Sequence, residues 1–531
     1  MNSLAELDQL NLESTAKTEM AALIRALLEQ AERDAKAIQA KDLKIEALTY
    51  ELAYYKRIRF SAKSEALAPL QRDVFEETWN TDISAIEAEV EQLQDGPCET
   101  VAKPKRPRAG RQPLPDHLPR IEHRHEPESC TCGHCGKELV KIGEDVTEQL
   151  DVEPAKFFVH RHIRPQYACR ACETVTAAPI PPAVIDGGLA AVGLLTWVII
   201  NKYLDHLPLY RLEQIAARDG VILSRSTLAD WVGRLGVALA PLADRLAWHL
   251  LQRDSLHADE TPVPQLDPGK GKTKKAYLWA YRSNDLQPGP KIIVFDYQAG
   301  RSGRYAQQFL GDWHGPLLVD DYGGYKALFA ATRAHPESQR LLEPCIELAC
   351  LAHARRKFFD LFQAGQSPIA QEALNRIAIL YAVEAEARDL STAERKQLRT
   401  EKSLPTLAAL HDWLQQTRQC TAPNTATSKA IDYSLKRWAA LTRYAETGDL
   451  PIDNNPAENC IRPIALGKKN WLFAGSERAG QRAAVIQTLL STAKLNGLDP
   501  SAWLKDTLEK LPTWPNRRID ELLPLSDMIK S

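Results

Sequence analysis

Two Cys-x-x-Cys pairs constrain this chain more than any other feature of its sequence. The first pair is Cys132 and Cys135, and the second is Cys169 and Cys172. The 33 residues between the pairs contain runs that alternate in polarity like β-strands, so both pairs can meet at hairpin ends. Zn²⁺ favours four tetrahedral thiolates at this kind of spacing. We therefore predict a zinc ribbon over residues 126–182, in which these four cysteines hold one structural zinc; four free buried thiols are the alternative.

The composition is that of an ordinary globular protein. Ten cysteines among 531 residues are too sparse for a disulfide scaffold, and Cys130 and His134 are interpreted as bystanders of the zinc site. The 67 basic and 69 acidic residues give a net charge of −2, which excludes a globally basic nucleic-acid coat but not a local basic surface. The N-terminus carries no signal-peptide pattern, and the apolar run Leu189–Ile200 is too short to span a bilayer. We therefore expect a cytoplasmic protein with no membrane partner.

Residues 1–70 are predicted to form a helical dimerisation segment. The apolar residues that recur every seven positions are Ile24, Ala31, Ile38, Ile45 and Leu52. Those three places later in the same register are Leu27, Leu48 and Tyr55. This is the a and d pattern of a coiled coil, although Asp34 and Lys41 interrupt it. We expect a homodimer or higher oligomer; an amphipathic helix packed on its own chain is the alternative.

A linker with a basic arm is predicted over residues 71–125. Residues 101–115 contain four prolines and no acid, and proline blocks helix formation. The basic residues of the arm are Lys103, Lys105, Arg106, Arg108 and Arg111. Such an extended arm can follow phosphates or lie in a minor groove, so we predict DNA contact, with a solvated linker as the alternative.

Residues 183–251 have a helical pattern throughout and include a helix-turn-helix signature. Gly220 can take the left-handed conformation of a tight turn, and Ser224 or Ser226 can cap the second helix. Arg225, Ser226 and Thr227 then lie at the leading end of a DNA-reading helix. A plain helical hairpin is the alternative.

Strand-like runs begin after residue 252 and predict a mixed sheet flanked by helices. This core is expected in two parts, residues 252–363 and 448–497. An all-helical insertion over residues 364–447 separates them, and a helical tail follows over residues 498–531. The chain is thus predicted to be a multidomain α+β protein.

Three acids of this core are candidate catalytic residues: Asp259 in a strand, Asp320 at a strand end, and Glu458 near the start of a helix. Asn455, which precedes Pro456, is the expected N-cap of that helix. Three carboxylates suit phosphoryl transfer assisted by two Mg²⁺ ions. Spacing alone does not single them out among 69 acids. Glu260 competes with Asp259, Asp321 competes with Asp320, and Glu458 could merely favour the helix start.

A chain of motifs makes the assignment more specific. The matching stretches, in order, are RIRFSAKSEAL at 57–67, RAGRQPLPDHLPR at 108–120, the two Cys pairs, DHLPLYRLEQIAARDGVILSRSTLADWV at 205–232, LHADETPV at 256–263, LLVDDYGGYKAL at 317–328, CLAHARRKFFD at 350–360 and DNNPAENCIRPIALGKKNWLFAGSERAG at 453–480. Together they resemble the transposases of the insertion sequence 66 family over nearly the whole chain. Asp321 departs from the family, which usually has Gly there.

The resemblance implies an RNase H-like, retroviral-integrase-like α/β catalytic core with a DDE triad of Asp259, Asp320 and Glu458, which would hold two Mg²⁺ (or Mn²⁺) ions. It implies a DNA transposase that binds terminal inverted repeats and target DNA and that works on the bacterial nucleoid. It also suggests small accessory proteins of the element as partners. The residues expected to contact phosphates near the triad are His353, Arg355, Arg356, Lys357, Arg462, Lys468 and Lys469. A non-catalytic zinc-containing DNA-binding protein and a structure-selective nuclease are the alternatives.

Overall fold

The computed structural model describes most of the chain from residue 118 onward and parts of the N-terminal segment. The described residues are 20, 25–27, 30–31, 33–39, 41–45, 114, 116, 118–126, 140–153, 156–267, 272–336, 338 and 340–525. The basic arm and the first cysteine pair lie outside them.

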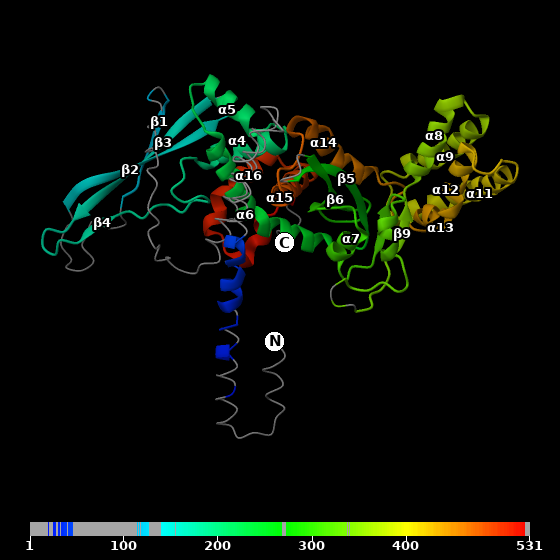
Figure 1. Cartoon of the computed structure of the whole chain (residues 1–531), viewed down its shortest axis with the longest axis horizontal. Coiled ribbons are helices and arrows are strands. Elements are labelled where there is room, and N and C mark those ends of the chain that lie inside the picture. Colours follow the sequence, from blue (N-terminus) through cyan, green and yellow to red (C-terminus); the bar gives the residue numbers. More distant parts are fainter. Residues whose placement is uncertain are drawn as a thin grey trace.

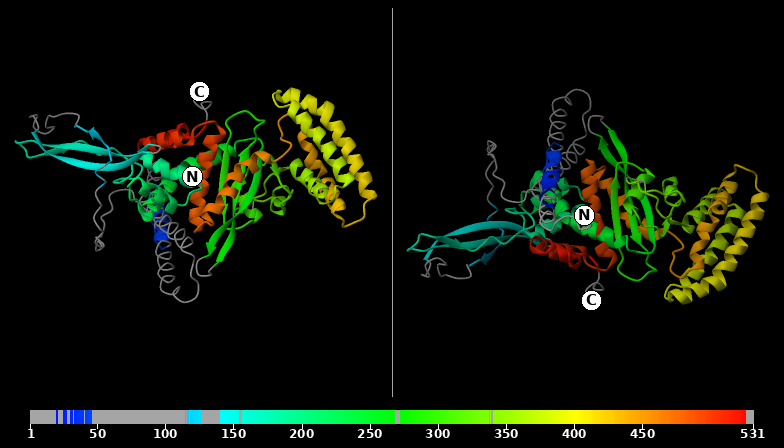
Figure 2. Two further views of the ribbon diagram at one scale, coloured as in Figure 1. Left: turned by 90° about the horizontal axis from the view of Figure 1, so that it is seen from above. Right: turned by 90° about the horizontal axis from the view of Figure 1, so that it is seen from below.

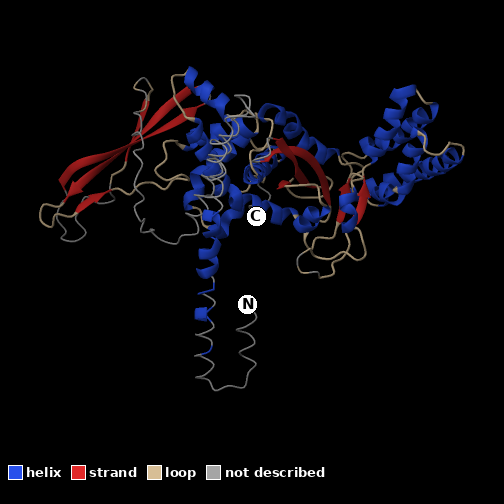
Figure 3. Ribbon diagram, in the orientation of Figure 1, coloured by secondary structure: helices blue, strands red, loops and turns tan. Residues whose placement is uncertain are grey.

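Strands form two separate sheets, and helices make up most of the remainder (Figure 3). The strands are β1 (Arg120–Arg124), β2 (Val140–Glu153), β3 (Lys156–Ala168), β4 (Val175–Ala177), β5 (Leu256–Asp267), β6 (Lys272–Ser283), β7 (Ile293–Gln298), β8 (Pro316–Val319) and β9 (Ile346–Ala349). The longer helices are α4 (Val192–Tyr203), α5 (Leu209–Arg218), α6 (Arg225–Leu250), α7 (Gly303–Leu310), α8 (Leu351–Gly365), α9 (Pro368–Glu386), α10 (Thr392–Leu398), α11 (Leu404–Gln419), α12 (Ala426–Lys436), α13 (Trp438–Thr442), α14 (Asn455–Trp471), α15 (Glu477–Leu495) and α16 (Pro500–Lys510). The short helical turns are η2 (Gly323–Leu328), η3 (Arg399–Ser403), η4 (Arg443–Glu446), η5 (Leu511–Thr513) and η6 (Asn516–Leu522).

The first sheet is a long hairpin that projects from one end of the molecule (Figure 1). Strands β2 and β3 are antiparallel, β1 pairs with β3 in parallel, and β4 pairs with the end of β3. The hairpin therefore carries the 169–172 turn at its tip, between β3 and β4, while its base packs on α4 through Leu150 and Phe157.

Helices α4, α5 and α6 join the hairpin to the second sheet. Gly220 takes the left-handed conformation in the α5–α6 turn, with φ of 72°. Ser224 is the N-cap of α6, because its hydroxyl accepts the backbone N–H of Thr227 at 3.1 Å. The core around α6 also takes in Leu489 of α15 and Leu504 of α16, so the C-terminal helices belong to this central body.

The second sheet has the order β7-β6-β5-β8-β9. Strands β7, β6 and β5 are antiparallel, whereas β8 and β9 run parallel to β5. One face packs on α14 and α15 through Leu278 and Ile464, and the other packs on α6, α7 and η2 through Trp279 and Tyr325. This sandwich of a mixed sheet between helices positions the acidic residues.

The helical insertion forms the end of the molecule opposite the hairpin (Figure 2). Helices α9 to α13 share a hydrophobic core with α8, and this core also includes Leu318 of β8 and Leu348 of β9. The insertion is therefore packed directly on the edge of the second sheet. Within the part of the chain that the structure describes, no helix combines the length and apolar character needed to cross a membrane.

Candidate carboxylate site

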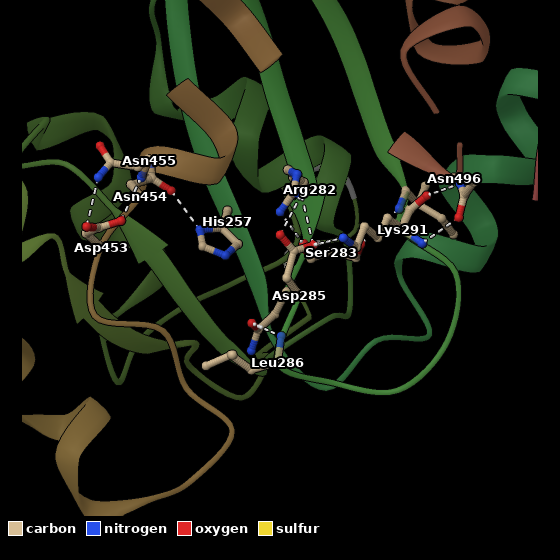
Figure 4. A network of polar contacts seen from close by, with 12 residues as sticks. His257, Arg282, Ser283, Asp285, Leu286, Lys291, Asp453, Asn454, Asn455 and Asn496 are labelled. Carbon is tan, nitrogen blue, oxygen red and sulfur yellow. Dashed lines mark hydrogen bonds and ion pairs between the residues drawn. The ribbon is translucent and has the colours of Figure 1, made fainter. Parts of the chain in front are cut away.

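Strand β5 and the head of α14 are tied together by a buried asparagine (Figure 4). The Asn454 side chain is fully buried; its Oδ1 lies 3.0 Å from Nδ1 of His257, and its Nδ2 donates to the carbonyl of Ala258 at 3.0 Å. Burial is the main cause that lowers the pKa of His257 to about 4, so this ring is neutral at pH 7 and can donate from Nδ1. The link brings the first turn of α14 against the beginning of β5.

Asp259 and Glu260 point to opposite faces of the sheet. Asp259 is paired with Ala280, whose side chain packs toward α14, whereas Glu260 is paired with Trp279 on the other face. The buried Glu260 carboxylate accepts hydrogen bonds from Tyr325 Oη at 2.6 Å and from the guanidinium of Arg301. Glu260 is therefore committed to a structural network, and Asp259 is the acid that faces α14.

Asp320 lies beside Asp259 because β8 runs parallel to β5. Leu318 of β8 is in register with His257, so the next residues on the same side are Asp320 and Asp259. The Asp320 carboxylate accepts the backbone N–H of Tyr322 at 2.9 Å. Its neighbour Asp321 is exposed and forms an ion pair with Arg437. The geometry thus favours Asp320 over Asp321 as the second acid of the site.

Glu458 reaches the same place from the first turn of α14. This helix begins one residue earlier than expected: Asn454, not Asn455, is the N-cap, and it makes no side-chain cap because its amide is used by β5. Tertiary contact therefore overrides the local capping preference.

The charges of Asp320 and Glu458 both act on Asp259. Burial is the largest cause that raises the pKa of Asp259 to about 8, and the negative charges of Glu260, Asp320 and Glu458 raise it further. Such crowding of like charges is relieved when a cation binds between them, and carboxylate oxygens are the ligands that Mg²⁺ prefers. The donor set therefore fits hard divalent cations.

His353, which the sequence predicts to contact DNA phosphates, lies beside Glu458. Its Nδ1 is 3.7 Å from Oε1 of Glu458, and potential ligand atoms of Cys350, His353 and Glu458 all lie within 4.8 Å of one another. Burial raises the pKa of the Cys350 thiol to about 12, and its sulfur accepts the N–H of Asn454. The Asn454 contact ties Cys350 to the segment that begins α14.

The other predicted site residues lie at three separate places. Arg225 is paired with Glu213 of α5 at 3.1 Å, while Ser226 and Thr227 lie beside it in the first turn of α6. Among the residues predicted to contact phosphates, Arg355, Arg356 and Lys357 on α8 and Arg462 and Lys469 on α14 have exposed side chains. Lys468 donates to the carbonyl of Pro262 at 2.9 Å, so its ammonium is engaged within the protein.

The second cysteine pair lies in a tight turn at the tip of the hairpin. Cys169 is buried, its N–H donates to the carbonyl of Thr174 at 3.0 Å, and Cys172 Sγ lies 3.2 Å from the Thr174 hydroxyl. Cys132 and Cys135 lie outside the described residues, so the structure places half of the predicted ligand set.

Sequence reasoning missed several residues that position the acids: His257, Asn454, Tyr381 and Arg437. The only local signal was the run Asp453 to Pro456, which we interpreted as a helix cap. The partners of these residues are more than 70 positions away along the chain, and no periodicity connects them.

Fold and site together define a multidomain mixed α/β protein with a zinc-finger part and a helix-turn-helix-like part. Comparison with known families is consistent over nearly the whole chain. Residues 187–482 match the Transposase IS66 family, residues 129–173 the zinc-finger binding domain of transposase IS66, residues 488–525 the IS66 C-terminal element, and residues 47–122 the Transposase C of IS166 homeodomain. The chain therefore belongs to the IS66 transposase family, with the zinc-binding and DNA-binding domains of that family.

Curated relatives are similar in sequence to this chain over nearly their full lengths. The uncharacterized protein y4jD of Sinorhizobium fredii is 37% identical over 486 residues, which cover 90% of this chain and 94% of the relative. The uncharacterized protein y4qI of the same organism is 39% identical over 492 residues, which cover 91% of this chain and 89% of the relative.

Proposed function

We propose that this protein is a DDE-type transposase that binds the terminal inverted repeats of its insertion sequence and performs metal-dependent strand cleavage and strand transfer. What supports the proposal is that Asp320 and Glu458, from two distant segments, both act electrostatically on Asp259, and that all three residues are half-buried. The mixed sheet with three antiparallel and two parallel strands, covered by helices on both faces, is compatible with the RNase H-like core that the family resemblance implies.

Each carboxylate has a role in this proposal. Asp259 lies within electrostatic reach of both other acids, and the three carboxylates together would hold two divalent cations. Two Mg²⁺ or Mn²⁺ ions supply activation of a water or 3′-hydroxyl and stabilisation of the leaving oxygen. The protein's own contribution is to hold the acids at fixed positions, with exposed basic residues of α8 and α14 beside them for DNA phosphates.

The remaining parts of the chain would hold the DNA. We assign terminal-repeat binding to the basic arm, to a zinc ribbon of Cys132, Cys135, Cys169 and Cys172, and to the leading end of α6. The variant Cys132→Ser should contain less zinc in elemental analysis, because the tetrahedral site loses one of its four thiolates. Small accessory proteins of the element are further candidate partners.

The test is cleavage of a DNA duplex that carries the terminal repeat, with the full chain and Mg²⁺ or Mn²⁺. Asp259→Asn, Asp320→Asn and Glu458→Gln should each reduce strand cleavage by at least about 100-fold while DNA binding in gel-shift experiments persists. The matched control Asp312→Asn, at an exposed acid that pairs with Arg340, should cleave like the wild type.

Three outcomes would contradict the proposal. Undiminished cleavage by Asp259→Asn would remove this residue from the mechanism. DNA binding without metal-dependent cleavage, even with accessory proteins, would favour a non-catalytic DNA-binding protein. Cleavage without any joined product would favour a structure-selective nuclease.

A further inference from the structure

The helical insertion reaches the carboxylate site through an arginine. Arg437 lies between α12 and α13, and its side chain is only 9% exposed. Its Nη2 donates to the backbone carbonyl of Asp320 at 3.1 Å and to Oε1 of Glu347 at 2.7 Å. Its Nε lies 3.6 Å from Oδ1 of Asp321. One buried guanidinium from the insertion thus contacts three acidic residues of the sheet edge, one of which is a proposed metal ligand.

A second contact comes from α9 at the other side of the site. The Tyr381 hydroxyl donates to Oδ2 of Asp453 at 3.0 Å. Asp453 also accepts from the backbone N–H and the side-chain amide of Asn455, at 3.1 and 2.8 Å. These bonds fix the segment that begins α14, whose first turn carries Glu458.

The two contacts act through a single packed body. The hydrophobic core of the insertion includes Leu318, two residues before Asp320, and Ile452, just before Asp453. Both acidic segments are therefore held against the same core, and a shift of the insertion would move both of them.

Arg437 also neutralises two acidic side chains beside Asp320. Asp321 and Glu347 lie next to Asp320 and could compete with it for a divalent cation. The guanidinium binds both competing carboxylates and neutralises their charge, whereas it contacts Asp320 only at the backbone carbonyl. The carboxylate of Asp320 therefore remains available for a cation.

We infer that the helical insertion is a positioning element of the carboxylate site, in which Arg437 fixes Asp320 and keeps Asp321 and Glu347 from the metals, and Tyr381 fixes the head of the helix that carries Glu458. This inference rests on the proposed function. Neither Arg437 nor Tyr381 touches the reacting atoms, so both are positioning residues.

The experiment is Mn²⁺ binding by the full chain without DNA, measured by electron paramagnetic resonance, with thermal unfolding of each variant followed by circular dichroism. Arg437→Gln and Tyr381→Phe are each expected to weaken Mn²⁺ binding by about tenfold, as loss of outer-sphere support does. Arg437→Lys, which keeps the charge but not the planar fork, should be intermediate. The matched controls are Arg388→Gln, at an exposed arginine of the same insertion, and Tyr305→Phe, at an α7 hydroxyl that accepts from Arg304 at 3.1 Å.

The variants separate this inference from the proposed function. If Asp320→Asn and Glu458→Gln lose Mn²⁺ binding while Arg437→Gln and Tyr381→Phe bind Mn²⁺ like their controls, the positioning role is overturned and the carboxylate site stands. If the carboxylate variants themselves bind Mn²⁺ like the wild type, the proposed function fails first. Should Arg437→Gln unfold, Tyr381→Phe decides alone, because it removes a single hydroxyl and keeps the ring.

Discussion

At the scale of single residues, acids that are adjacent in sequence have different contacts because their side chains point in different directions. Asp259 faces the other carboxylates, while Glu260 is bound by Arg301 and Tyr325 on the opposite face. Asp321 is bound by Arg437, whereas Asp320 is beside Asp259. The alternation of a strand and the position of one guanidinium thus separate acids that are adjacent in sequence.

The buried amide of Asn454 should be the most sensitive uncharged residue near the site. Asn454→Ala removes its bonds to His257 and Ala258 and leaves buried polar groups unsatisfied. We expect a loss of about 1–3 kcal/mol in the free energy of unfolding, measured by urea denaturation. Strand cleavage should also fall, because Glu458 is no longer held against β5.

The matched control is Asn375→Ala, at an exposed residue of α9 that bonds only Gln371 in the described structure. This change should alter stability by less than about 0.5 kcal/mol. Equal losses in the two variants would show that the Asn454 contacts add nothing specific.

At the scale of secondary structure, α15 protects the β7 edge of the second sheet. β7 is an edge strand, and its outward N–H groups at Ile293 and Phe295 donate to the hydroxyls of Thr492 and Thr488, at 3.3 and 2.8 Å. A helix therefore satisfies backbone groups that a bare edge would offer to another chain.

Replacement of these two hydroxyls by methyl groups should lower the stability of the protein. Thr488→Val and Thr492→Val each keep the side-chain volume and leave a buried N–H without an acceptor. We expect each to lower the free energy of unfolding by about 1–3 kcal/mol in chemical denaturation. Thr400→Val, whose hydroxyl is exposed and bonds Lys396, should change it by less than about 0.5 kcal/mol; a similar loss there would refute the edge argument.

The hairpin carries a stack of histidines at the pairing of β1 and β3. Nε2 of His123 lies 2.8 Å from Nδ1 of His160, and Nε2 of His125 lies 3.0 Å from Nδ1 of His162. Burial chiefly, and then the other three rings, lower the pKa of His162 to about 4. Nε2 of His160 lies 2.7 Å from Oδ2 of Asp151.

The stability of the hairpin should therefore depend on pH. A histidine in the unfolded chain has a pKa near 6.5, whereas folded His162 has a pKa of about 4. Between about pH 6.5 and 4 the unfolded chain therefore binds a proton that the folded chain does not bind. The free energy of unfolding decreases as the pH falls through this range. Deuterium exchange of peptides from β1 and β3, corrected for the intrinsic rate, should increase over this range in the wild type. The increase should be smaller in His162→Gln, and peptides from α11 should not follow it; an unchanged increase in the variant would assign the effect to another group.

At the scale of the whole molecule, the candidate site lies between two projecting parts, the hairpin at one end and the insertion at the other (Figure 1). The described N-terminal helical residues leave large apolar side chains in water: Leu27, Ile38 and Ile45 are 60%, 58% and 61% exposed. These belong to the a and d series of the predicted coiled coil, and a second copy of the chain is the partner that we expect to cover them.

Charges on this apolar stripe should disrupt self-association. We expect the double variant Ile38→Glu, Ile45→Glu to sediment as a smaller species than the wild type in analytical ultracentrifugation, because two core positions of the zipper become charged. Gln39→Glu, one position outside the stripe, is the control and should sediment like the wild type. A wild type that is already monomeric would refute the prediction.

Local patterns in the sequence carried several features of the fold. Gly220 and Ser224 predicted the turn and cap of the α5–α6 unit, and both are confirmed by the φ of Gly220 and the cap hydrogen bond of Ser224. These features depend on near neighbours in the chain, where steric preference and one hydrogen bond decide the outcome. The motifs likewise gave the family, which the comparisons confirm. The predicted triad residues remain a proposal.

Other features required the folded chain. Asn454 replaced Asn455 as the N-cap of α14 because its amide is bound by β5, nearly 200 positions earlier. Arg437 and Tyr381 looked like ordinary residues of an insertion until the fold brought them to Asp320 and Asp453. The sequence by itself determined the family and the local turns, because these follow from short-range order along the chain. Only the tertiary structure decided which acids face one another and what holds them, because burial and charge pairing depend on contacts between distant segments.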